Sequence, residues 1–133
     1  SVYLTHKIKL YPTPDQEQYL LNACGVTRFA FNWAVDENDR EYAETGKILG
    51  EFTLVKRFNA IRREKFPWTY DVTKWACQDG ITRYAKAMDD FIAKIHDKPK
   101  HKARKNDESF YFCGVNGCYF NHFLGYDCIG CFY

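Results

Sequence analysis

The hydrophobic pattern starts as an alternation. Within residues 2–10 the even positions are mostly apolar, while Lys7 and Lys9 occupy odd positions. A period of two predicts a half-buried strand, here with one core face and one basic face.

Helical spacing follows this strand. A helix start is predicted at Thr13, which is a typical N-cap residue. Pro14 suits the first helical position, and Gln16 suits the capping-box position three residues after the cap. Gly25 is expected to end this helix, and a second helix then runs to Gly46, a residue type that commonly terminates helices.

Two more helices and a strand-rich tail are expected. Residues 53–66 carry an apolar stripe among many cations, and Pro67 ends them. Residues 72–95 repeat large apolar side chains at helical spacing, with a bend expected at Gly80. From residue 109 the chain is aromatic and rich in glycine, which is typical of strands joined by tight turns.

Arg28 and Asn32 lie one helical turn apart, beside the apolar stripe of the second helix. Side chains at i and i+4 share a face, so these two can contact a ligand or tie the helix to a neighbouring element. The sequence leaves both roles open.

Composition favours a packed domain, and charge is unevenly distributed. The 133 residues are 46% hydrophobic and 18% aromatic. No run approaches the ~20 apolar residues of a membrane span, so a cytoplasmic protein without a membrane partner is expected. Net charge is only +2, yet residues 98–105 hold five lysine or arginine residues and no acid. This basic strip is expected to contact a polyanion, with a solvated loop as the alternative.

Four segments within residues 3–113 carry a family resemblance: HKIKLYPTPDQEQYLLNACGVTRFAFNWAV, ETGK, YDVTKWACQDGITRYAKAMDDFIAK and KPKHKARKNDESFYF. In order and spacing, they resemble the N-terminal part of TnpB (OrfB)-type proteins, transposon-encoded RNA-guided nucleases related to the type V CRISPR effectors. The resemblance implies an α+β fold, in which a four-helix recognition (REC) bundle is inserted into a small, partial β-barrel, the wedge (WED) domain. It assigns residues 1–12 to the first wedge strand, 13–97 to the recognition domain, 98–105 to a basic linker and 106–133 to returning, truncated, cysteine-rich wedge strands.

The function implied by the resemblance is nucleic-acid binding. Such proteins grip a guide RNA scaffold and the DNA next to the target, reading backbone shape while base pairing reads sequence. The Asp, Glu and Asp of the family's RuvC-like nuclease are not found here at matching spacing, so a truncated or excised module that is not an enzyme is expected.

The residues expected to bind nucleic acid are lysines and arginines, one asparagine and one tyrosine. Tyr70 follows the most basic helix and could stack on an unpaired base, whereas the neighbouring Trp68 is interpreted as a plug between helices. The full set is Lys7, Lys9, Arg28, Asn32, Lys56, Arg57, Arg62, Arg63, Lys65, Tyr70, Lys98, Lys100, Lys102, Arg104 and Lys105.

The tail holds two cysteine pairs, Cys113 with Cys118 and Cys128 with Cys131. Four thiolates would suit zinc, the one cofactor considered, and buried free thiols are the alternative.

Two other functions stay open. A stand-alone helix-turn-helix DNA-binding repressor would dimerise on a palindromic site. An interaction or inhibitory fragment would instead pack against a full-length nuclease and bind nucleic acid weakly.

Overall fold

The computed structural model describes residues 7–9, 11–104, 109–112, 118–121 and 127–129, with side chains for residues 11–104. Three α-helices form most of it: α1 (Pro14–Thr45), α2 (Glu51–Lys65) and α3 (Lys74–Ile92), with a short 3-10 helix, η1 (Pro67–Asp71), between the last two. The strands are β1 (Lys7–Lys9), β2 (Ser109–Phe112), β3 (Cys118–Asn121) and β4 (Asp127–Ile129).

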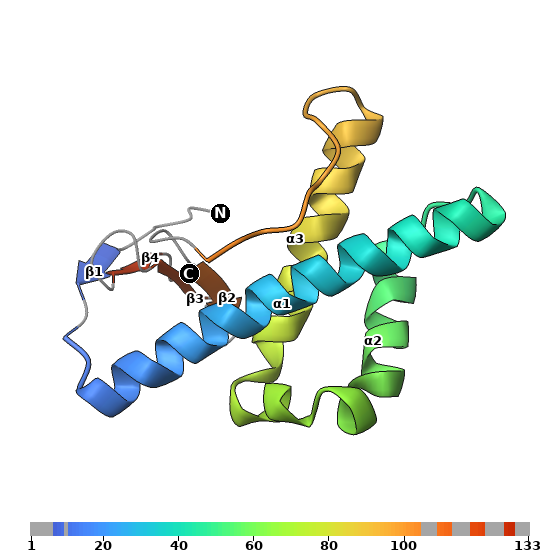
Figure 1. Cartoon of the computed structure of the whole chain (residues 1–133). Coiled ribbons are helices and arrows are strands. Elements are labelled where there is room, and N and C mark those ends of the chain that lie inside the picture. Colours follow the sequence, from blue (N-terminus) through green and yellow to red (C-terminus); the bar gives the residue numbers. More distant parts are fainter. Residues whose placement is uncertain (1–6, 10, 105–108, 113–117, 122–126, 130–133) are drawn as a thin grey trace, which may run out of the picture.

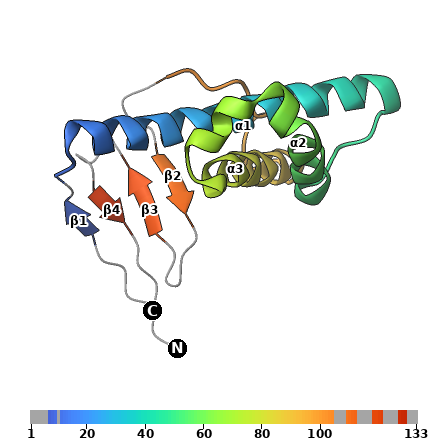
Figure 2. The ribbon, with the colours of Figure 1, turned by 90° about the horizontal axis from the view of Figure 1, so that it is seen from below.

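Helix α1 runs along the whole molecule and organises the other elements (Figure 1). The strands lie beside its N-terminal half, and α2 and α3 lie beside its C-terminal half (Figure 2). Both α3 and β2 contact α1, and β2 also contacts α3.

The strands pair in the order β1-β4-β3-β2, and all neighbours are antiparallel. The first strand therefore pairs with the last, with Ile8 opposite Cys128. Consecutive strands β2 and β3 pair with Phe112 opposite Cys118. The residues between these two strands, where a tight turn is expected, lie outside the described ranges.

The fold class expected from the resemblance is wrong. In place of a four-helix bundle there are three α-helices in the described chain, because residues 14–45 form one continuous helix. The described strands form an open sheet whose edges are β1 and β2, so they do not close into the barrel of a wedge domain. The described hydrophobic core is made by side chains of the three α-helices and by Val72, which follows η1.

Both predicted ends of α1 are confirmed. Thr13 accepts from the backbone of Gln16, and the Gln16 side chain accepts from the backbone of Thr13, which completes the capping box. At the other end Gly46 has a left-handed φ of 72° and donates its N–H to Tyr42 O.

Gly25 does not end the helix. A glycine inside a helix costs only ~1 kcal/mol relative to alanine, and packing can offset that. Residues on both sides of Gly25 are buried, and Thr27 Oγ1 donates to Ala76 O of α3 at 2.9 Å. Contact with α3 therefore holds the two expected helices together as one.

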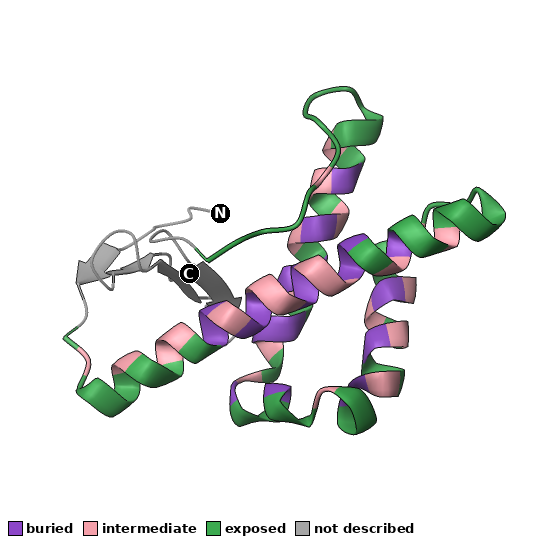
Figure 3. Ribbon diagram, viewed as in Figure 1, coloured by how far each residue is buried: buried purple, intermediate pink, exposed green. Residues whose placement is uncertain are grey.

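The helices meet around a core of apolar side chains, which Figure 3 shows as buried positions facing inward on all three helices. One buried polar group joins them. Asn38 donates to Tyr84 Oη at 2.6 Å and accepts from the backbone of Leu49 at 2.9 Å. It thereby ties α1 to α3 and to the segment that leads into α2. None of the described helices combines the length and the apolar content that crossing a bilayer would need.

Candidate nucleic-acid interface

The basic segment after α3 lies along α1; we call residues 98–104 the strap. Asn32 donates through Nδ2 to Lys102 O at 2.9 Å, and Lys102 N donates to Asn32 Oδ1 at 2.7 Å. The side chain of Asn32 thus serves as a clamp for the strap backbone. Of the two roles left open by the sequence, the structure shows the tie between elements.

Ion pairs continue this attachment toward the C-terminal end of α1. Asp36 Oδ1 lies 2.6 Å from His101 Nε2, and Asp39 Oδ1 lies 3.0 Å from Lys98 Nζ. The strap therefore runs antiparallel to α1, and part of its charge is matched by α1 carboxylates.

Two of the predicted cations on α2 are engaged within the protein. Arg57 forms salt bridges with Glu37 at 3.1 Å and Glu41 at 3.3 Å, which join α2 to α1. Arg62 is only 6% exposed and donates to Thr69 Oγ1 at 2.8 Å and Thr69 O at 2.9 Å.

These contacts shape the local electrostatics. Partial burial acts to raise the pKa of Glu37, but hydrogen bonds from Arg40 and Arg57 prevail and lower the pKa of this carboxyl. Arg62 also lies over the ring of Tyr70, 4.0 Å from its centroid, so it fixes η1 against α2. We assign structural roles to Arg57 and Arg62, and their contact with nucleic acid stays a prediction.

The other predicted cations of α2 are exposed. Lys56, Arg63 and Lys65 are all exposed to solvent. Arg63 lies 5.8 Å from the ring centroid of Tyr70, whose side chain is 49% exposed. We call these three cations the α2 surface. Helix α2, which carries these cations, lies on the other side of α1 from the strap (Figures 1 and 2).

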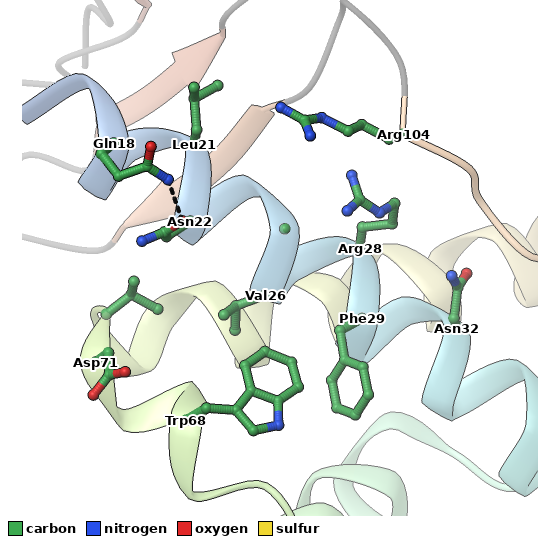
Figure 4. Close-up of a pocket in the computed structure, with 12 residues that line it drawn as sticks. Gln18, Leu21, Asn22, Val26, Arg28, Phe29, Asn32, Trp68, Asp71 and Arg104 are labelled. Carbon is green, nitrogen blue, oxygen red and sulfur yellow. Dashed lines mark hydrogen bonds between the residues drawn. The ribbon is translucent and has the colours of Figure 1, made fainter. Parts of the chain in front are cut away.

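A pocket of about 580 Å³ opens between the N-terminal half of α1, η1 and the end of the strap. It brings together three predicted residues, Arg28, Asn32 and Arg104. Figure 4 shows the guanidinium groups of Arg28 and Arg104 on one side of it and the indole of Trp68 on the other. The sequence indicated that Trp68 plugs the junction between helices; its ring does pack on Phe29, but 46% of its surface is exposed.

Cys24 and Cys77, the cysteines whose side chains the structure describes, are buried and do not resemble metal ligands. Burial raises the pKa of Cys24 to about 12 and raises that of Cys77, so both thiols stay protonated near neutral pH. No cluster of three or more metal-ligating side chains occurs within the part of the chain that the structure describes.

Several predicted residues cannot be placed by their side chains. Three of them lie outside the described residues: Lys105, Cys113 and Cys131. Four others lie in strands β1, β3 and β4, for which only the backbone is described: Lys7, Lys9, Cys118 and Cys128. The zinc site therefore stays a prediction.

Comparison with protein families supports part of the expected relationship. Residues 2–47 match the OrfB (IS605) family model, described as a helix-turn-helix domain. Helix-turn-helix domains are DNA-binding modules, so the match supports the N-terminal region of an OrfB/TnpB-type transposase for this segment. A search of curated proteins found no significant match.

The matched segment differs from a helix-turn-helix unit in its geometry. Such a unit places two helices at an angle, joined by a short turn. Here the described part of the segment contains β1 and the whole of α1, and α1 is unbroken from Pro14 to Thr45. Insertion of a separate recognition helix into the major groove is therefore not the contact that this segment offers.

Proposed function

We propose that this chain is a nucleic-acid-binding module of a TnpB-type, RNA-guided system, which holds guide RNA scaffold and the DNA next to the target. The proposal rests on the match of residues 2–47 to a DNA-binding domain family. The sequence resemblance across residues 3–113 supports the finer role in RNA-guided recognition.

The distribution of charge supports two separate contacts. Lys56, Arg63 and Lys65 are exposed on α2, and Lys100 and Arg104 belong to the strap on the other side of α1. Phosphate contacts by lysine and arginine supply most of the sequence-independent affinity for nucleic acid. Exposed cations on two elements at different sides of α1 suit a protein that holds two nucleic-acid segments.

The C-terminal half of α1 limits where a polyanion can approach. It carries acidic side chains that pair with Arg57 and with the strap, namely Asp36, Glu37, Asp39 and Glu41. Like charges repel phosphate, so we place the nucleic-acid contacts on the α2 surface and at the Arg104 end of the strap.

A stand-alone DNA-binding protein is the second candidate. The family match favours it because the match names a DNA-binding domain and says nothing of RNA. Such a protein would prefer duplex DNA to structured RNA, whereas a guide-holding module binds both.

The test is a salt titration of the full chain against a structured RNA, a duplex DNA and a single strand of equal length. Each neutralised duplex phosphate adds about −0.9 to the slope of log affinity against log salt concentration. We expect steep slopes with RNA and duplex DNA. Steep binding to duplex DNA alone would favour the second candidate. Weak, flat binding to all three would contradict both and favour a fragment that packs against another protein.

A further inference from the structure

We propose that the pocket between α1, η1 and the strap holds one unpaired nucleotide, with its base against Trp68 and its phosphate between Arg28 and Arg104. This inference rests on the proposed function and adds a site for a single-stranded element within it. The volume of about 580 Å³ lies within the ~300–1,000 Å³ typical of small-molecule sites.

One wall of the pocket is aromatic. The ring of Phe29 meets that of Trp68 edge to face, with centroids 4.7 Å apart and an interplanar angle of 70°. Phe29 also packs edge to face on Phe66, so the cluster is anchored from α2 as well as from α1. Trp68 is thus held in place while nearly half of its surface stays accessible, which is what a stacking platform for a base requires.

The opposite wall is cationic and is assembled by the clamp. Arg28 comes from α1, and Arg104 comes from the strap, two residues beyond Lys102. Because Asn32 fixes the backbone of Lys102, it also fixes where Arg104 leaves the strap. Two guanidinium groups on one side of a pocket suit a bound phosphate, which each can contact through charge-assisted hydrogen bonds.

The other polar side chains that line the pocket determine which way round the nucleotide binds. Asp71 lines the pocket on the η1 side, where it would repel phosphate and accept from a base amino group. Gln18 Nε2 donates to Asn22 Oδ1 at 2.8 Å on the α1 wall. That bond leaves Gln18 Oε1 as an acceptor and Asn22 Nδ2 as a donor for a base edge.

The test compares a duplex carrying one central unpaired adenosine with the same duplex fully paired, in DNA and in RNA forms. Affinities are measured by fluorescence anisotropy with the full chain. We expect the bulged form to bind at least about fivefold more tightly, as stacking of one base predicts. The DNA and RNA pairs show which of the two supplies the nucleotide.

Two variants and one control test whether the preference for the bulged duplex depends on the pocket. Trp68→Ala should reduce the preference for the bulged form severalfold while leaving affinity for the paired duplex nearly unchanged. Arg104→Gln should lower affinity for both forms, and the preference for the bulged form should fall severalfold with it. Trp75→Ala is the matched control, because Trp75 lies on α3 outside the pocket lining. Arg104 is exposed, so its variant remains informative even if Trp68→Ala alters folding.

Equal affinity of the wild-type chain for bulged and paired forms would overturn the pocket assignment while leaving the proposed function intact. A preference that survives both variants would overturn it too. Absence of binding to every form would overturn the pocket assignment and the proposed function together.

Discussion

Asn32 and Lys102 lie 70 residues apart in the sequence and exchange two hydrogen bonds. The amide of Asn32 pairs with the backbone N–H and C=O of Lys102 in the way a neighbouring strand would. One side chain on α1 therefore sets the position of the strap, and with it the position of Arg104 at the pocket.

Replacing Asn32 by Ala removes both bonds. We expect faster amide hydrogen exchange in residues 98–104 and a loss of about 1–2 kcal/mol in the free energy of unfolding. Asn22→Ala is the matched control, because Asn22 lies on the same helix and bonds to Gln18 only within that helix. Unchanged exchange in the strap of the Asn32 variant would show that the ion pairs alone hold it.

Two glycines should respond oppositely to alanine. A Cβ on Gly80 would lie 2.2 Å from Thr27 O and 2.9 Å from Ala30 Cβ, whereas one on Gly25 would meet nothing closer than Arg28 Nη2 at 3.7 Å. We expect Gly80→Ala to destabilise by at least about 2 kcal/mol, because forced separation of α1 and α3 outweighs the better helix propensity. Gly25→Ala should stabilise by about 0.5–1 kcal/mol.

Urea unfolding followed by circular dichroism measures both changes. Equal effects of the two substitutions would mean that α1 and α3 do not cross as closely as Gly80 and Thr27 indicate.

The buried amide of Asn38 should matter more than its size suggests. Asn38→Ala leaves the Tyr84 hydroxyl and the Leu49 N–H without their partner, so we expect a loss of about 2–4 kcal/mol in unfolding free energy. Tyr84→Phe should cost about 1–2 kcal/mol, since only Asn38 Nδ2 loses a bond. Tyr42→Phe, at a position 58% exposed, is the control, and a change as large as that of Tyr84→Phe would contradict the assignment.

Glu37 should make stability depend on pH. Its pKa in the folded chain is lowered below the ordinary value of 4.5, so its ionised form stabilises the fold above that value. The stabilisation is lost as pH falls below 4.5 through the folded pKa. Glu37→Gln should therefore destabilise at pH 7 and approach the wild type in acid. Glu64→Gln, an exposed substitution of the same charge, should show no such convergence in thermal unfolding scans.

Local signals predicted the element types well. The capping box at Thr13 and the left-handed Gly46 are decided by neighbouring residues, so the sequence alone located both ends of α1. The prediction that Gly25 ends the helix was wrong. The small free-energy cost of a glycine inside a helix is outweighed by packing of α1 against α3, and a local sequence pattern does not reveal that packing. The barrel was expected from the family resemblance. In the described sheet β1 and β2 are the two edge strands and do not pair with each other, so the sheet is open.

The candidate site was predicted in part. Arg28, Asn32 and Arg104 were named from charge and spacing, but their convergence depends on a clamp between residues far apart in the chain. Trp68 was interpreted as a plug between helices, because sequence hydrophobicity cannot distinguish a fully packed ring from one that is also exposed on a pocket wall. Arg62 looked like a phosphate contact, although its burial depends on Thr69 in a turn whose path the sequence does not reveal.

The most direct measurement compares salt dependence of duplex DNA binding for two triple variants that remove equal charge. One replaces Lys56, Arg63 and Lys65 of the α2 surface by Ala, and the other replaces Lys47, Lys86 and Lys94, which are exposed and lie outside α2. We predict that the first variant makes the slope of log affinity against log salt concentration less negative by about 2–3, and that the second makes it less negative by less than about 1. Equal slopes for the two variants would contradict the assignment of nucleic-acid binding to this surface.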